Sequence, residues 1–214
     1  MWLITSGPTQ SPLDGFRILT NRSTGTFGTL LTEALLKKGK KVTLIHGVGS
    51  KTPDPHPLLK RIQVITNKDL ERTLKKELGT HHYNVVVHAA AVLDFVPKAI
   101  AKGKKKTKKG YWNLKLIPTK KIINQIKKWS PKTTLVGFKL EVGTTKTNLL
   151  KEARRVQKKS AANYMVANEL NEGKDVQHNA YLLNSAGQII AETKGKKDLV
   201  RVLLANRLDL GGLS

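Results

Sequence analysis

The sequence predicts an α/β protein built on a doubly wound, mostly parallel sheet that ends in a C-terminal β-hairpin and a helix. Two observations carry this prediction. Short apolar segments alternate with segments whose apolar residues recur at helical spacing, which indicates strands joined by helical crossovers. Residues 83–92 are β-branched and apolar on both faces, as is typical of a central strand in a parallel sheet.

The first half of the chain is expected to form three strands and two helices. Gly39 ends the first helix, and prolines exclude regular structure from the loop 48–57. Asn67 is the expected N-cap of the second helix, whose leucines fall on one face. A long polar loop separates the first strand from the first helix. In order, we expect a strand at 2–4, a helix at 27–38, strands at 41–45 and 62–65, and a helix at 68–78.

The second half continues the same alternation and then changes to a hairpin. No internal repeat or linker divides the chain, so we expect one domain spanning residues 1–214. In order, we expect strands at 83–92 and 112–117, a helix at 118–129, a strand at 133–138, a helix at 148–159, a strand at 164–168, a hairpin of 179–183 with 188–192, and a helix at 196–208.

These elements predict a Rossmann-like sheet, in which ligands bind beyond the carboxyl ends of the strands. That rule places 5–8 and 89–94 on one edge. The segment Ser23–Gly28 joins a small-residue loop to a helix N-terminus, which predicts a phosphate site, although many ordinary strand-to-helix turns have the same composition. The fingerprint G-x-G-x-x-G is missing after the first strand, so a nicotinamide cofactor is not favoured.

Composition narrows the class of protein further. The 214 residues contain no cysteine, which excludes disulfides, thiolate nucleophiles and cysteine metal sites. The six histidines show no metal-ligand spacing. The N-terminus does not read as a signal peptide, and the longest apolar run, 85–93, is too short to cross a bilayer. We therefore expect a cytoplasmic protein.

The charge balance is extreme, with 39 Lys+Arg against 15 Asp+Glu. Such a field attracts polyanions, and it attracts nucleotides and phosphorylated metabolites as well. No RNA-reading aromatic signature, zinc finger or helix-turn-helix spacing accompanies it. The basic run 98–109 is either a solvated loop or a segment that closes over phosphates when a ligand binds.

Several short motifs stand in a recognisable order. They are Ile4-Thr-Ser-Gly-Pro-Thr9 with Pro12-Leu-Asp14, Arg17-Ile-Leu-Thr-Asn21-Arg-Ser-Thr-Gly25, Ala89-Ala-Ala-Val-Leu-Asp94, the lysine run, Leu116-Ile-Pro-Thr119, Val136-Gly-Phe138 with Glu141, and Val166-Ala-Asn168. From Leu3 to about Leu183 the chain resembles the phosphopantothenoylcysteine synthetase (phosphopantothenate–cysteine ligase) family, in a stand-alone form without the flavin decarboxylase.

The resemblance implies a ligase that joins L-cysteine to 4′-phosphopantothenate in coenzyme A biosynthesis. The pantothenate carboxylate attacks the α-phosphorus of a nucleotide and releases pyrophosphate, and the cysteine amine then displaces the nucleotide from the acyl-nucleotidylate. CTP is the expected co-substrate, with ATP as the alternative, and Mg²⁺ accompanies it. The family also implies a homodimer, for which the segment Pro12–Thr20 is a plausible arm.

The resemblance assigns roles to individual residues. Asn21 and Lys104 are the expected catalytic residues, with Lys102 as the alternate lysine because its motif aligns in two ways. The expected substrate-binding residues are Arg17, Asn21, Ala90 and Ala91. The expected nucleotide-binding residues are Gly7, Asp94, Lys102, Lys104, Phe138, Arg155 and Lys159, and no metal ligand is assigned.

The chain departs from the family pattern at a few positions. Thr26 replaces a lysine of the glycine-rich loop, and Lys120-Lys121 replaces a Pro-Asp or Pro-Lys pair. These departures concern the triphosphate contacts and the nucleotide preference more than the fold. Two alternatives stay open: a short-chain-reductase-like enzyme, which needs a Tyr-x-x-x-Lys pair, and a basic α/β nucleic-acid-binding protein without catalysis, although nucleic acid is the less expected partner.

Overall fold

The structure, a computed structural model, describes residues 1–107, 110–170, 179–206 and 208. Within them, eight strands form the central sheet in the order β12-β11-β10-β9-β6-β1-β4-β5. The strands from β10 to β5 run parallel, and the hairpin of β11 and β12 adds two antiparallel strands at one edge. The predicted fold class is confirmed. The strands are β1 Trp2–Ser6, β4 Val42–Gly47, β5 Leu59–Val64, β6 Val85–His88, β9 Thr134–Val142, β10 Tyr164–Leu170, β11 Asn179–Leu183 and β12 Ile189–Lys194.

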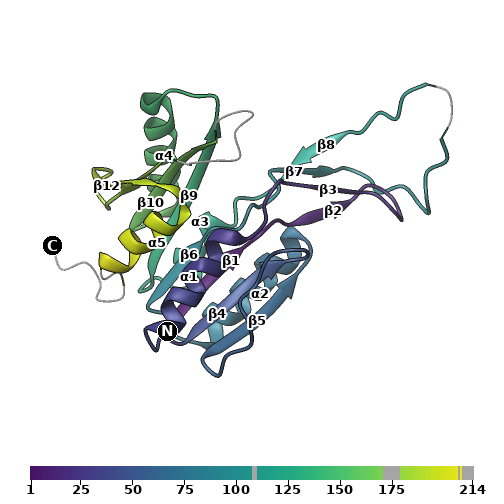
Figure 1. The fold of residues 1–214 in the computed structure, drawn as a ribbon. Helices are drawn as coiled ribbons and strands as arrows, with labels where there is room; N and C mark the ends of the chain where they lie inside the picture. Colours follow the sequence, from purple (N-terminus) through teal and green to yellow (C-terminus); the bar gives the residue numbers. More distant parts are fainter. Residues whose placement is uncertain (108–109, 171–178, 207, 209–214) are drawn as a thin grey trace.

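Helices cover both faces of this sheet (Figure 1). Helices α1 (Thr26–Lys37) and α5 (Gly195–Ala205) pack on one face, and α2 (Asn67–Thr80), α3 (Ile123–Trp129) and α4 (Lys146–Ser160) pack on the other. Strand β1 serves both cores because successive side chains of a strand point to opposite faces: Leu3 joins one core, and Trp2 and Ile4 join the other.

The strand order reverses between β1 and β6, which is the point where open α/β sheets bind ligands. The two strands stay linked just beyond their carboxyl ends. Pro8 bridges to Ala91, and the Thr9 amide donates to the Ala91 carbonyl at 3.2 Å. We call the residues around these two strand ends, 5–9, 21 and 88–94, the rim.

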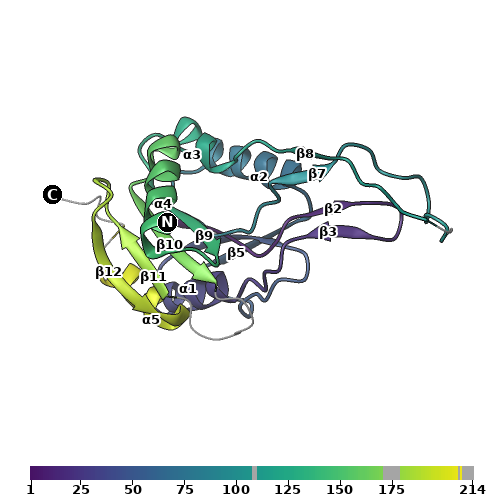
Figure 2. The ribbon, with the colours of Figure 1, turned by 90° about the horizontal axis from the view of Figure 1, so that it is seen from above.

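Two short antiparallel ribbons leave the rim and project from the body (Figures 1 and 2). One pairs β2 (Gln10–Pro12) with β3 (Ile18–Thr20), and the other pairs β7 (Phe95–Pro97) with β8 (Leu116–Pro118). Backbone hydrogen bonds join their extensions: Gly15 N to Gly103 O at 2.9 Å, and Ala101 N to Leu13 O at 3.0 Å. We call residues 10–20, 95–107 and 110–118 together the arm; residues 108–109 of the basic run lie outside the described residues.

Several boundaries differ from the sequence-based expectations. The long polar loop contains the β2–β3 ribbon, and the strand expected over 83–92 ends at His88. It ends there because the Ala90 amide donates to the Thr5 hydroxyl, at 3.2 Å, and not to a backbone carbonyl of the sheet. The Ala91 amide donates to Gly7 O, and beyond it the chain leaves the sheet. The strand expected at 112–117 is confined to β8.

The helix expected from Pro118 begins only at Ile123. Pro118 still pairs with Phe95 in the ribbon, and the Thr119 amide donates to Asp94 O. The predicted cap of α2 was also wrong by one residue: Thr66, not Asn67, caps the helix, through a reciprocal capping box with Asp69. The last helix ends at Ala205, whereas residue 207 of its predicted span lies outside the described part.

Within the described part of the chain, no helix is long and apolar enough to cross a membrane.

Candidate functional site

Asn21 lies at the centre of the rim, directly after β3. Its side-chain amide donates to the carbonyl oxygens of Ala91 and Val92, both at 3.2 Å. Both acceptors lie in the segment after β6, and Asn21 lies in the segment that connects β1 to α1. This one side chain therefore holds the two segments together. The structure therefore brings Asn21, Ala90 and Ala91 together, as expected of a shared substrate site.

One buried residue of the rim, His88, was not among the predicted site residues. His88 is buried at the end of β6, and its Nδ1 lies 2.9 Å from the Thr5 hydroxyl, which accepts from the Ala90 amide. Burial lowers the pKa of His88 to about 4, so the ring is neutral near pH 7. The pair therefore supports the backbone at Ala90 without adding charge.

Gly7 and the glycine-rich loop bring the N-terminus of α1 close to the rim. Gly7 has φ +74°, and a Cβ there would lie 1.7 Å from Ser50 Oγ. Gly25 likewise has φ +72° and no room for a Cβ beside Ser50. These glycines are thus required by backbone conformation and close packing, which is a reason independent of any ligand.

Helix α1 begins with Gly25 as its N-cap and with no side-chain capping hydrogen bond. The amides of its first turn are therefore not occupied by a capping side chain, and together with the helix dipole they favour an anion. Thr24 and Thr26 hydrogen-bond each other at 2.8 Å beside this turn. The phosphate-binding reading of residues 23–28 stays a prediction, with this helix end as its physical basis.

Asp94 forms an ion pair that the sequence analysis missed. Lys121 Nζ lies 2.5 Å from Asp94 Oδ1, and both side chains are more than half exposed. Thr119 holds the two segments together, since its amide donates to Asp94 O at 2.8 Å and its hydroxyl to Leu93 O at 2.6 Å. In the sequence, Lys120-Lys121 stands out only because it replaces the family's Pro-Asp or Pro-Lys pair, and this replacement does not indicate a partner for either lysine.

A second missed group ties α2 to the rim. The Thr9 hydroxyl donates to Asn67 Oδ1 at 2.6 Å and accepts from the Leu93 amide, and Asn67 Nδ2 donates to Leu93 O at 2.7 Å. Asn67 is free for this task because Thr66 caps the helix. The amide and the carbonyl of Leu93, the residue before Asp94, are therefore both hydrogen-bonded.

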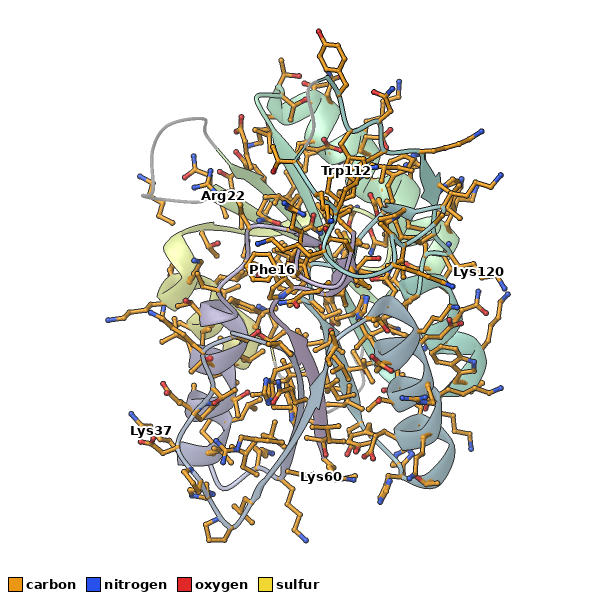
Figure 3. All side chains as sticks on the ribbon, turned by 90° about the vertical axis from the view of Figure 1, so that its right-hand side faces the viewer. Phe16, Arg22, Lys37, Lys60, Trp112 and Lys120 are labelled. Carbon is orange, nitrogen blue, oxygen red and sulfur yellow. The ribbon has the colours of Figure 1, made fainter. Side chains whose placement is uncertain are left out.

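Arg17 and the lysines of the basic run lie on the arm. Arg17 pairs with Asp14, and its guanidinium lies 5.5 Å from the centre of the Trp112 ring. Lys104 Nζ lies 4.8 Å from the centre of the Phe16 ring. Figure 3 views this end of the molecule, with Phe16 and Trp112 near its centre.

These arm residues are not beside Asn21 of their own chain. Arg17 stands before β3 and Asn21 directly after it, so the three residues of β3 lie between them, and the four steps of extended chain span about 13 Å. Lys104 follows Gly103, which is bonded to Gly15 at the same end of the arm. Lys102 is exposed on this segment. One chain thus presents the predicted site in two parts.

Phe138 lies on β9, half-buried, with its ring 5.0 Å from that of Phe27 at the start of α1. Arg155 and Lys159 do not share this location. Helix α4 connects the carboxyl end of β9 to the amino end of β10, and both residues lie in its later turns. At 1.5 Å per residue, Lys159 is about 20 Å along the helix from its rim end.

The assignment of Arg155 and Lys159 to nucleotide binding stays a prediction, and the connectivity of α4 places both residues away from the rim of their own chain. Arg155 instead pairs with Glu152, with Arg155 Nε 2.8 Å from the carboxylate. We leave both residues out of the proposed site.

The structure also bears on the reductase alternative. A Tyr-x-x-x-Lys spacing does occur, at Tyr111 and Lys115, on the arm. Tyr111 is 98% exposed and lies outside any helix, away from the rim. This pair therefore has none of the surroundings that a catalytic tyrosine requires. No three His, Asp or Glu residues in the described ranges are grouped so as to hold a metal ion.

Comparison with known proteins shows the family to which the chain belongs. The family model described as the DNA/pantothenate metabolism flavoprotein C-terminal domain matches residues 1–209. The chain is 36% identical over 168 residues to the coenzyme A biosynthesis bifunctional protein CoaBC of Thermococcus kodakarensis, covering 78% of this chain and 41% of that protein. With CoaBC of Bacillus subtilis it shares 34% identity over 139 residues, covering 65% and 34%. The chain thus spans less than half the length of these relatives.

Solved structures share the fold. A DNA/pantothenate metabolism flavoprotein from Streptococcus pneumoniae superposes with a TM-score of 0.86 at 31% identity, covering 96% of both chains. A Cab2 mutant in complex with phosphopantothenate-cysteine has a TM-score of 0.76 at 19% identity, covering 98% of this chain and 86% of that one, which shows likeness of fold alone. The predicted resemblance is confirmed: the chain belongs to the phosphopantothenoylcysteine synthetase family, the DNA/pantothenate metabolism flavoprotein C-terminal domain.

Proposed function

We propose that residues 1–214 form one ligase domain that joins L-cysteine to 4′-phosphopantothenate through an acyl-nucleotidylate, with CTP as the preferred nucleotide. The observation that carries the proposal is the placement of Asn21 against the Ala91 and Val92 carbonyls at the reversal point of the sheet, in a chain of this family. Relatives that the chain matches are named as coenzyme A biosynthesis proteins.

The chemistry needs charge stabilisation more than acid–base groups. In the first step a carboxylate oxygen bonds to the α-phosphorus, the bond from that phosphorus to the bridging oxygen breaks, and pyrophosphate leaves with the electron pair. In the second step the cysteine nitrogen bonds to the acyl carbon, the nucleoside monophosphate leaves, and the amine proton passes to solvent. Oriented amides and lysines suit both steps.

The rim supplies part of this apparatus. We assign Asn21 to the acyl-nucleotidylate, the Ala90–Ala91 backbone to the pantothenate portion, and Asp94 to the nucleotide. The uncapped first turn of α1 suits the triphosphate, and Phe138, which packs on Phe27 next to that turn, suits the base.

We propose that the partner subunit of a homodimer supplies the remaining cations of the site. Arg17 lies about 13 Å along the arm from Asn21 of its own chain, and Lys104 lies at the same end of the arm as Arg17, so a two-fold axis that brings each arm to the other rim completes both sites. The arm also exposes an unusual amount of apolar surface, which is typical of a protein interface. Its exposed apolar residues are Phe16, Ile18, Phe95, Ile100, Tyr111, Leu114, Leu116 and Ile117.

Magnesium fits this site only as part of the nucleotide. No carboxylate cluster in the described part of the chain would hold the ion by itself. Mg²⁺ is commonly bound through substrate phosphates, water and one or two carboxylates. When bound, it would neutralise phosphate charge, and Asp94 is the rim carboxylate available to it.

Pyrophosphate release tests the proposal. We expect release that depends on phosphopantothenate, is faster with CTP than with ATP, and leads to an amide product only after cysteine is added. The Asp54→Asn variant, altered at an exposed loop position, is the control for preparation and charge. Absence of pyrophosphate release with either nucleotide would contradict the assignment.

A further inference from the structure

A buried carboxylate in the arm has no part in the proposed chemistry. The Asp14 side chain has no exposed area, although the arm is a thin projection from the body (Figure 1). A carboxylate is buried at a large cost in free energy unless hydrogen bonds compensate it. The partners of Asp14 therefore indicate its role.

The two carboxylate oxygens have separate partners. Oδ1 accepts from the amides of Phe16, at 2.8 Å, and Arg17, at 2.7 Å, and so closes the turn between β2 and β3. Oδ2 accepts from Arg17 Nη1 at 2.5 Å and from the Lys105 amide at 3.1 Å. A residue that only stabilised the turn would need the first oxygen alone.

The charge of Asp14 is fixed by the same contacts. Burial by itself raises the pKa, but hydrogen bonds from the amides of Arg17, Phe16 and Lys105 and from the Arg17 guanidinium outweigh it. The net effect holds the pKa of Asp14 well below its usual range, so Asp14 remains an anion among cations.

Asp14 thus joins two segments that are 91 positions apart in the sequence. Arg17 Nη1 also reaches the Lys105 carbonyl, at 3.4 Å. The cation of Lys105 lies 5.4 Å from the centre of the Trp112 ring, the same ring that Arg17 contacts. Arg17 and the lysine segment are therefore held in one arrangement around Asp14.

We propose that Asp14 is a positioning residue that presents Arg17 and the segment 102–106 together to the anionic substrates. The inference rests on the proposed function, because that function gives these cations their task. A substrate that meets cations already in place loses less conformational entropy in ordering them, so Asp14 acts mainly on the rate of the first step.

The test compares Asp14→Asn with the matched control Asp54→Asn, both in the full-length protein. The asparagine keeps one acceptor oxygen and replaces the other by a donor, which cannot accept from Lys105 or Arg17. Hydrogen exchange without substrate should become roughly tenfold faster over 101–106 in Asp14→Asn. Exchange in β6 and β10 should match that of the control, which shows that the variant is folded.

A second pair of variants isolates the link to the lysine segment. Lys105→Pro and Lys105→Ala both remove the lysine side chain, but only proline also removes the amide that donates to Asp14. We expect faster exchange over 101–104 in Lys105→Pro than in Lys105→Ala, with the β2–β3 turn unchanged in both.

Activity then connects the arrangement to the reaction. We expect kcat for pyrophosphate release to fall about tenfold to a hundredfold in Asp14→Asn, with a smaller change in KM. Unchanged exchange over 101–106 in that variant would overturn the inference, and so would faster exchange with unchanged kcat. Absence of pyrophosphate release in the wild-type protein would overturn the proposed function instead, and the exchange data would separate the two failures.

Discussion

Lys121 and Asp94 form an ion pair at the rim, with Nζ 2.5 Å from Oδ1, although the sequence gives no reason to connect them. Both side chains are more than half exposed, so the pair adds little to stability. Asp94 is the residue that we assign to the nucleotide, so the ion pair has a role in ligand binding instead. Lys121 compensates the negative charge of Asp94 where phosphates must approach.

We therefore predict that Lys121→Met raises the KM for the nucleotide by about fivefold to tenfold, because Asp94 then repels phosphate. The melting temperature should change little. Lys120→Met is the matched control, since Lys120 is an exposed neighbour, labelled in Figure 3. Equal KM values for the two variants, measured by pyrophosphate release at constant ionic strength, would show that Lys121 has no such role.

Asn21→Asp should give a folded protein that stalls at or after nucleotidylation. The aspartate would place an oxygen where the amide now donates to the Ala91 and Val92 carbonyls, so the charge would repel those carbonyls and the acyl-nucleotidylate. We expect product formation to fall about a hundredfold or more. Quenched-flow analysis of pyrophosphate and amide product locates the affected step, and normal turnover would show that Asn21 is misassigned.

His88 should make stability depend on pH. Its pKa is lowered from 6.5 to about 4 by burial, so the unfolded chain binds a proton that the folded protein rejects between these values. The contribution of the neutral His88 to the free energy of unfolding is complete above pH 6.5, and it is lost as the pH falls from 6.5 toward 4. The full difference corresponds to about 3 kcal/mol.

Denaturant unfolding between pH 4 and 7 checks this prediction. His88→Asn keeps a polar group near Thr5 and does not titrate, so its stability should fall less steeply at acid pH than that of the wild type. His82→Asn, at an exposed position, should retain the wild-type slope. Parallel slopes for all three proteins would argue against a neutral buried His88.

The capping box of α2 gives a prediction for stability alone. Thr66→Ala should lower the free energy of unfolding by about 1 kcal/mol, because it removes the acceptor of the Asp69 amide. Asn67→Ala should instead raise KM for substrate, because Asn67 holds Leu93 next to Asp94. Urea unfolding and steady-state kinetics of both variants separate the two roles, and a reversed pattern would restore Asn67 as the cap.

The sequence predicts the sheet and its helices well because their signals are local. Apolar periodicity in residues 30–35 or 83–88 reflects burial on one or two faces, which does not depend on distant partners. The boundaries fail where long-range hydrogen bonds decide them. Ala90 leaves its strand for the Thr5 hydroxyl, and Thr119 bonds Asp94 in place of starting a helix.

The candidate site divides in the same way. The motif around Asn21 and the small residues after β6 identify the rim, because the rule for strand ends brings them together. Asp14 stands in one of the motifs, but the motif does not indicate its contact with Lys105, and His88 and Lys121 carry no comparable signal because their partners lie far away in the sequence. Arg155 and Lys159, which the family resemblance assigned to the nucleotide, lie in the later turns of α4, away from the rim of their own chain.

Mixing subunits tests most directly the central claim that one rim and the other arm form each site. Arg17→Ala and Asn21→Ala should each be inactive alone. In heterodimers formed by mixing, one site combines the intact rim of the first variant with the intact arm of the second. At equal concentrations we expect recovery of about a quarter of the wild-type rate, because half of the dimers are mixed and each has one complete site. A mixture that exchanges subunits but stays inactive would contradict the claim.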